Sequence, residues 1–234
     1  MTKENKPIIG IIASNYSKKN RPFNCYSKFV NNYSKRIIKS GGIPIGILNI
    51  KGMNICDGFI IQGGSKIDSE ILKKIDYIVK NNKPCIGICL GMQALVAYDY
   101  LKRNNFKLIN NKTLEKEYLD LAFNHNKVNP FYLNNKNKAC HKVYLDKNSK
   151  ISRTLKKEII DVYSLHNYKV KDNIMKNSNL FKVIGKSNDN VIEVIESINN
   201  DFLIGVQFHP ELDDNCSLLF KELIKSTKKK NHNF

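Results

Sequence analysis

The sequence predicts an α/β protein, with helices on both faces of a mostly parallel β-sheet and a smaller antiparallel region in the C-terminal half. Two observations support this fold class. In the first hundred residues, short apolar runs rich in β-branched residues alternate with segments whose apolar residues recur at helical spacing. From about residue 140 onward, the pattern changes to a series of short strand-like runs, several of which we expect to pair antiparallel.

The predicted strands of the first half are short and continuously apolar, as expected for strands that helices cover on both faces. They span residues 7–13, 43–48, 58–61 and 84–88. Gly41 and Gly42 end the first predicted helix. Apolar residues three and four apart predict helices over residues 29–38, 67–79 and the stretch that follows residue 89.

The second half is predicted to begin with a variable surface region at residues 104–137, which holds a short helix near Thr113 to Leu121. Residues 199–201 (Asn-Asn-Asp) predict a hairpin turn between the last two strands. Because no internal repeat is present, we expect one domain over residues 1–227 and a basic disordered tail at residues 228–234. Short strands are predicted at residues 142–145, 159–163, 181–184, 191–195 and 202–208, and a closing helix at residues 217–224.

The chain of 234 residues carries a formal charge of +18 and is 41% hydrophobic. Its lysines are scattered among asparagines and accompany no recognition motif, so the charge does not by itself predict a nucleic-acid partner. No apolar run is long enough to span a bilayer, and the N-terminus lacks a signal-peptide pattern. The six cysteines form no Cys-x-x-Cys pair and no zinc-site spacing, which favours reduced thiols in the cytoplasm.

Cys89 is the candidate nucleophile. It stands between Gly87 and Gly91, where a predicted strand turns into a predicted helix. A sharp strand-to-helix turn lifts its corner residue clear of the backbone, and the helix N-terminus favours the thiolate. A cysteine in this position can also be an ordinary core residue, and the motif alone leaves both interpretations open.

His209 and Glu211 favour the catalytic interpretation. They follow the apolar run at residues 202–208, and as residues i and i+2 of a strand they would point to the same side. An imidazole can act as the base for a thiol, and a carboxylate can orient that imidazole and stabilise its protonated form. Cys89, His209 and Glu211 are therefore the predicted catalytic residues of an enzyme that attacks an amide carbonyl.

The oxyanion that develops in such a reaction needs backbone N–H donors. The predicted sources are Leu90, directly after the nucleophile, and the glycine turn Gly63-Gly64 at the end of a neighbouring strand. Among the other histidines, His166 is predicted to line a pocket. The remaining three are predicted to be structural or to lie in the tail: His125, His141 and His232.

These motifs resemble the class I glutamine amidotransferase family. The family's markers occur here in the same order, as the Gly63-Gly64 turn, Gly-x-Cys-x-Gly-x-Gln at residues 87–93 and His-Pro-Glu at residues 209–211. The resemblance extends from Pro7 to about Ile224. It implies a flavodoxin-like fold and a γ-glutamyl thioester on Cys89.

Four short segments carry a closer resemblance within that family: residues 40–44 (Ser-Gly-Gly-Ile-Pro), 57–59 (Asp-Gly-Phe), 141–143 (His-Lys-Val) and 164–166 (Ser-Leu-His). By these segments the chain is most similar to the free-standing γ-glutamyl hydrolases, which include γ-glutamyl-γ-aminobutyrate hydrolase. The chain departs from that branch at Leu90, where arginine is common and leucine is more usual in ammonia-donating glutaminases. It departs again at Tyr168, where a glutamine is expected. The resemblance implies that four further residues help to hold the γ-glutamyl group: Gln93, Ser164, Leu165 and His166.

The sequence thus predicts a cysteine hydrolase of small γ-glutamyl compounds that needs no metal or organic cofactor. The alternative is the glutaminase subunit of an amidotransferase, which would use glutamine and supply ammonia to a partner synthase. A basic nucleic-acid-binding protein on an inactive amidotransferase scaffold is a third hypothesis, and the complete set of triad residues argues against it. We expect no membrane association, and the sequence leaves a homodimer open.

Overall fold

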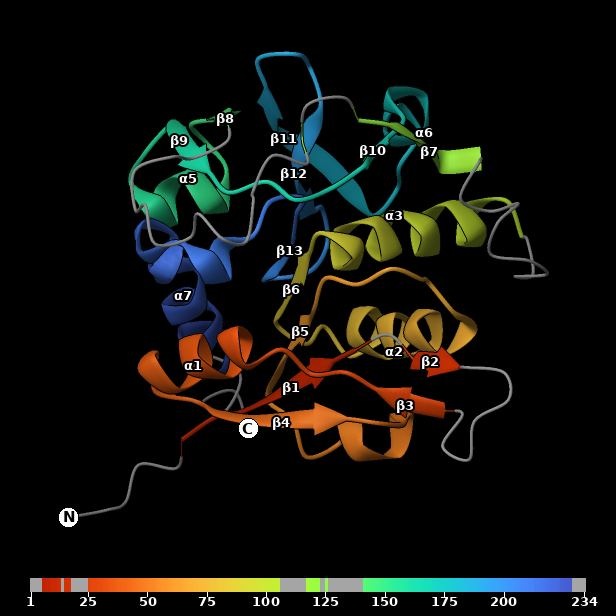
Figure 1. The fold of residues 1–234 in the computed structure, drawn as a ribbon, viewed down its shortest axis with the longest axis vertical. Helices are drawn as coiled ribbons and strands as arrows, with labels where there is room; N and C mark the ends of the chain where they lie inside the picture. The colour runs from red at the N-terminus through yellow and green to blue at the C-terminus, as the bar shows by residue number, and fades with distance from the viewer. Residues whose placement is uncertain are drawn as a thin grey trace.

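The computed structural model describes residues 6–13, 15–17, 25–105, 117–122, 125 and 141–228. Among these residues, nine strands form one central sheet in the order β4-β1-β5-β6-β13-β12-β11-β8-β9. Helices lie against both faces of this sheet (Figure 1). The predicted α/β class is confirmed.

One half of the central sheet is parallel. The strand β13 (Leu203–Val206) enters this half from far along the chain and pairs parallel with β6. Both faces of β5, β6 and β13 are buried, which explains why their sequences are continuous apolar runs. The other parallel strands come from the first half of the chain: β1 (Ile8–Ile12), β4 (Ile43–Ile47), β5 (Gly58–Ile61) and β6 (Cys85–Ile88).

The other half of the same sheet is antiparallel, as predicted for the C-terminal half of the chain. The direction changes between β13 and β12, which pair antiparallel on either side of the turn predicted at residues 199–201. The antiparallel region is therefore continuous with the parallel one. Its strands are β8 (His141–Leu145), β9 (Ile159–Val162), β11 (Phe181–Ser187) and β12 (Ile192–Ser197).

Two hydrophobic cores fill the space between the sheet and its helices. One core includes apolar residues of α2 (Ser69–Lys80) and α3 (Leu90–Arg103). The other includes residues of α1 (Asn31–Lys39), α5 (Lys150–Leu155) and α7 (Ser217–Lys228), and α7 contacts both of the others. Each large apolar side chain buried in these cores contributes about 1.5–3 kcal/mol of transfer free energy.

Smaller elements surround the sheet. The prediction of a helix that extends to Leu121 is wrong at its end, because β7 (Leu119–Leu121) pairs antiparallel with β10 (Tyr168–Val170) and finds its hydrogen-bond partners there. Residues 113–116 of that prediction lie outside the described residues. The other small elements are β2 (Asn15–Ser17), β3 (Cys25–Ser27), α6 (Asp172–Lys176), and the 3₁₀ helices η1 (Ile50–Met53), η3 (Pro210–Leu212) and η4 (Asp214–Cys216).

At the C-terminal end, Lys228 is the last residue of α7. The rest of the predicted tail, residues 229–234, lies outside the described residues. No helix in the described part of the chain combines the length and the apolarity that crossing a lipid bilayer would require.

The packing of α3 on β5 depends on Gly91. A Cβ at this position would stand 2.2 Å from the carbonyl oxygen of Ile61, so Gly91→Ala must push α3 away from the sheet. We expect this variant to lower the free energy of unfolding by about 1–3 kcal/mol, measured by urea denaturation. Gly52→Ala is the matched control, because no atom lies within 4 Å of its Cβ position. An equal loss in both variants would contradict the prediction.

Candidate active site

Cys89 stands at the sharp turn between β6 and α3. Its backbone has φ of 53° and ψ of −108°, a conformation that residues other than glycine rarely adopt and that costs about 1–3 kcal/mol. The neighbouring glycines keep this turn tight, since a Cβ at Gly87 would stand 2.9 Å from the carbonyl carbon and oxygen of Gly91. The side chain of Cys89 is mostly buried, at 8% exposed.

The pairing of β6 with β13 brings the late histidine to this turn. Ile88 is in register with Val206, and the Cys89 N–H donates to the Val206 carbonyl at 2.8 Å. His209 follows three residues later, and its own N–H donates to the Tyr163 carbonyl, just after β9, at 2.9 Å. Both residues are therefore held by backbone hydrogen bonds at the carboxyl edge of the parallel strands, where α/β folds bind their ligands.

Gly63, in the turn after β5, lies next to both Cys89 and His209. A Cβ placed on Gly63 would stand 3.2 Å from His209 Cε1 and 3.5 Å from Cys89 Cβ. The imidazole, the nucleophile turn and the glycine turn therefore meet at one point. Any side chain at position 63 would crowd that point, which is a physical reason for glycine there.

Glu211 is the third member of the predicted triad. Its Oε1 lies 2.7 Å from His209 Nδ1. The expectation that the two residues share one side of a strand is wrong, because Glu211 belongs to the 3₁₀ helix η3, which begins at Pro210. Arg36 on α1 holds this turn by donating from Nε to the Glu211 carbonyl at 3.0 Å.

The charge on His209 is controlled by its neighbours. Burial by itself lowers the pKa of the imidazole, but the Glu211 carboxylate and the Cys89 sulfur outweigh burial and raise the pKa of His209 to about 10. Because Glu211 occupies Nδ1, the buried Nε2 is the nitrogen left for the sulfur, and it has no other hydrogen-bond partner among the described residues. The arrangement can hold a proton on the imidazole beside the thiol.

Tyr33 on α1 is a site residue that sequence reasoning missed. Its hydroxyl accepts the Gly63 N–H at 3.2 Å. Burial, followed by the nearby Glu211 carboxylate, raises the pKa of Tyr33 well above its ordinary value, so the hydroxyl stays protonated. In the sequence, Tyr33 is only one member of a helical apolar pattern, and no local signal separates it from a core residue.

The other predicted site residues lie at different distances from the thiol. Leu90 is the buried first residue of α3, whereas Gly64 is exposed in the loop after β5. The Leu165 carbonyl oxygen lies 4.0 Å from Cys89 Sγ, so the loop between β9 and β10 forms a wall beside the candidate nucleophile. Ser164 in this loop is fully buried, and its hydroxyl donates to the His125 carbonyl at 2.8 Å.

Gln93 and His166 are buried and bind the protein itself. Gln93 Nε2 donates to the Tyr168 carbonyl at 3.3 Å and to Gln207 Oε1 at 3.1 Å. His166 Nδ1 donates to the same Tyr168 carbonyl at 2.8 Å. Both side chains thus hold the loop that carries Leu165 in place, and their contact with a γ-glutamyl group stays a prediction.

Comparisons with known proteins give a family match, relatives in sequence and a neighbour in fold. The sequence matches the family described as glutamine amidotransferase class-I over residues 15–225. A Rickettsia prowazekii protein described as glutamine amidotransferase-like is 28% identical over 95% of this chain and 98% of its own length. The CTP synthase of Pelagibacter ubique is 30% identical over 82% of this chain, which spans only 38% of that enzyme. The solved glutaminase domain of Trypanosoma brucei CTPS, with bound acivicin, shares the fold, with a TM-score of 0.66 and 14% identity over 96% of this chain and 94% of that one.

Glu211→Gln tests the electrostatic control of His209. Without the carboxylate, burial is opposed only by the sulfur, so we expect the pKa of His209 to fall by at least about one unit, measured by an NMR titration of the ring. Because the pKa of His209 is higher in the folded than in the unfolded protein, its protonated ring stabilises the fold. This stabilisation is complete below the unfolded-state pKa of about 6.5 and is lost as the pH rises through the folded-state pKa of about 10. The wild type should therefore lose more stability across this interval than Glu211→Gln.

The matched control for this experiment is Glu222→Gln, which removes a carboxylate that pairs with Lys225 on α7. The control should leave the titration of His209 unchanged. If Glu211→Gln also leaves it unchanged, Glu211 does not control the charge on the imidazole.

Proposed function

This chain belongs to the class I glutamine amidotransferase family, and we propose that it is a cysteine hydrolase that cleaves the γ-glutamyl amide bond of a small compound through a thioester on Cys89. One observation carries the proposal. Cys89 stands on a strained turn beside the imidazole of His209, whose Nδ1 lies 2.7 Å from the buried carboxylate of Glu211. These are the three parts of an activated thiol nucleophile, its proton carrier and the group that orients that carrier.

In the first step, the Cys89 sulfur attacks the carbonyl carbon of the γ-glutamyl amide. The C–N bond breaks, and the protonated His209 delivers its proton to the leaving amine nitrogen. The products are a γ-glutamyl thioester on Cys89, a free amine and a neutral imidazole. The raised pKa of His209 supports this role, because it keeps the proton available at neutral pH.

In the second step, the neutral His209 accepts a proton from water while the water oxygen attacks the thioester carbonyl. The C–S bond breaks, glutamate leaves, and Cys89 regains its sulfur as a thiolate beside the imidazolium. Glu211 keeps Nδ1 occupied throughout, so that Nε2 is the nitrogen that exchanges the proton with sulfur, amine and water.

The oxyanion of both steps would be bound by the backbone N–H groups of Gly63 and Leu90. Leu90 opens α3, where unpaired N–H groups and the helix dipole favour negative charge. The Gly63 N–H now donates to the Tyr33 hydroxyl, so the substrate oxygen would have to replace Tyr33 as its acceptor. Gln93, Ser164 and His166 would then act mainly through the Leu165 loop that they hold beside the thiol.

A glutaminase that supplies ammonia to a synthase is the second candidate. Two observations favour it: the similarity to CTP synthases, and leucine at position 90, where the hydrolase branch commonly has arginine. The chemistry at Cys89 is the same in both cases, because glutamine is itself a γ-glutamyl amide. The two candidates differ in the amine that is released and in whether a partner synthase receives it.

We also propose that residues 1–227 act as one domain in a reducing, cytoplasmic compartment. The unbroken sheet from β4 to β9 supports a single domain over its described part. Four buried cysteines of the described residues are free thiols, which supports a reducing environment: Cys56, Cys85, Cys89 and Cys216.

Substitution of the triad tests the catalytic assignment. We expect Cys89→Ala and His209→Ala to abolish glutamate release from a γ-glutamyl amide, because each removes a group that reacts. Glu211→Ala should leave a small residual rate, since it removes only the orienting carboxylate. Cys56→Ala is the matched control and should retain activity. Near-normal turnover by a correctly folded His209→Ala variant would contradict the assigned proton carrier.

The choice of amine separates the two candidate functions. We expect the purified chain alone to hydrolyse γ-glutamyl amines, with glutamate release measured for these compounds and for glutamine. Intact mass after brief exposure should show a γ-glutamyl adduct in the wild type and none in Cys89→Ala. Glutamine turnover that appears only after a synthase is added would replace the hydrolase with the ammonia donor.

A further inference from the structure

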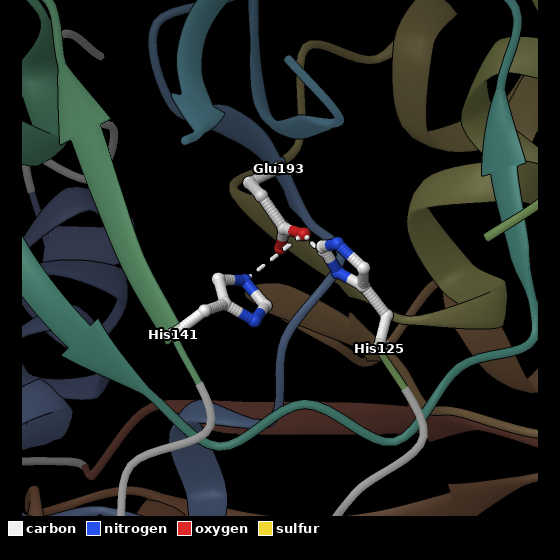
Figure 2. A group of neighbouring side chains, drawn as sticks. All are labelled: His125, His141 and Glu193. Atoms are coloured by element: carbon white, nitrogen blue, oxygen red, sulfur yellow. Dashed lines mark ion pairs between the residues drawn. The ribbon is translucent and has the colours of Figure 1, made fainter. Parts of the chain in front are cut away.

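A second buried cluster of ionisable side chains lies on the antiparallel half of the sheet, beside the candidate active site. Four residues from four separate segments form this histidine cluster: His125 after β7, His141 at the start of β8, His166 between β9 and β10, and Glu193 on β12. Figure 2 shows the Glu193 carboxylate directed between the rings of His125 and His141. The sequence interpretation of His125 and His141 as structural residues did not include this convergence.

The donor atoms of the histidine cluster converge on one small volume. Glu193 Oε1 lies 3.1 Å from His125 Nδ1, 3.2 Å from His141 Nε2 and 3.5 Å from His166 Nε2. His125 Nδ1 and His166 Nε2 are 3.2 Å apart. In a tetrahedral zinc site with bonds of about 2.0–2.2 Å, neighbouring ligand atoms are about 3.3–3.6 Å apart. The separations of Glu193 Oε1 from the nearest nitrogens of His125 and His141 are close to this range.

Two of the rings are oriented by partners on their outer nitrogens. His166 Nδ1 donates to the Tyr168 carbonyl at 2.8 Å, which leaves the Nε2 lone pair directed into the cluster. His125 Nε2 lies 3.0 Å from Asp189, whose carboxylate also accepts a hydrogen bond from Ser187. Histidines that bind metals typically donate their other N–H to a carbonyl or carboxylate in this way, which fixes the tautomer and the ring plane.

Within the part of the chain that the structure describes, several buried polar atoms of the cluster have no hydrogen bond. Glu193 is fully buried, and both of its carboxylate oxygens are without a hydrogen bond of ordinary geometry among the described residues. Both ring nitrogens of His141 likewise have no hydrogen bond among the described residues. A fully buried carboxylate without such hydrogen bonds is a costly arrangement that a bound cation would stabilise.

We propose that the histidine cluster is a binding site for a divalent transition metal, with zinc the best match, held by His125, His141 and Glu193, whose ligand atoms all lie within 4.8 Å of one another. His166 borders this group, with its Nε2 3.2 Å from His125 Nδ1. Imidazole nitrogens and a carboxylate oxygen suit zinc, whereas magnesium and calcium prefer oxygen ligands throughout. The metal would tie three chain segments together, next to the loop whose Leu165 carbonyl lies 4.0 Å from Cys89 Sγ.

Metal content of the full chain tests this proposal independently of any catalytic activity. After incubation with zinc and dialysis against metal-free buffer, elemental analysis should find about one zinc per chain. Replacement by Co²⁺ should give the visible absorption bands of four-coordinate cobalt. Zinc, but not magnesium, should also raise the melting temperature of the wild type. Absence of stoichiometric zinc together with an unchanged melting temperature would overturn the proposal and leave the cluster as a shared-proton network.

Matched variants show which residues bind the metal. His141→Gln and Glu193→Gln should lose the stoichiometric zinc, and Asp189→Asn should bind it about 10–100-fold more weakly, because Asp189 only orients His125. Glu222→Gln removes a carboxylate that pairs with Lys225 on α7, and should keep the zinc. Cys89→Ser should keep it as well, since the thiol is not a ligand. Zinc retained by Glu193→Gln, or lost from Cys89→Ser, would overturn the assigned site.

If Glu193→Gln does not fold, the exposed residue Asp189 keeps the proposal testable. Asp189→Asn changes the outer contact of His125 and the hydrogen bond from Ser187, but it replaces none of the proposed ligands, and the Asp189 carboxylate is about half exposed, at 55%. An affinity for zinc equal to that of the wild type in this variant, together with unaltered cobalt absorption, would contradict the ligand role of His125.

Discussion

The parallel pairing of β6 with β13 is the contact on which the candidate active site depends. It joins segments more than a hundred residues apart and places Cys89 beside the end of a strand that leads into His209. Backbone hydrogen bonds fix both ends of this junction, from Cys89 to Val206 and from His209 to Tyr163. The imidazole and the sulfur meet because the sheet register leaves their backbones little freedom, which is the pre-organisation that the proposed nucleophile and proton carrier would need.

The site combines local strain with buried charge, and both require support from the surrounding fold. The positive φ of Cys89 persists because α3 packs tightly on β5 through Gly91. The buried pair of His209 and Glu211 is held by Arg36, which binds the Glu211 carbonyl from α1. Tyr33 on the same helix binds the Gly63 turn. The helix α1 thus positions both the Gly63 turn and the turn that carries Glu211.

The antiparallel half of the sheet supplies the other wall of the site. The loop after β9 carries Leu165 to the thiol. The Tyr168 carbonyl that follows this loop accepts hydrogen bonds from His166 and from Gln93. The same loop carries His166 into the histidine cluster around Glu193. A metal bound there would stiffen the wall without contacting the reacting atoms. The parallel half would then provide the chemistry and the antiparallel half the shape of the pocket.

The sequence by itself determined the features whose signals are local. Apolar runs and helical spacing predicted the strands and helices of the core, and the glycines around Cys89 predicted its turn. The tertiary structure alone decided that residues 119–121 form a strand, that Glu211 lies on a 3₁₀ turn, and that Tyr33 reaches Gly63. It alone gathered His125 and Glu193 into one cluster. The physical reason is that a local pattern encodes burial and backbone conformation, whereas the partner of a side chain depends on which distant segments pack together.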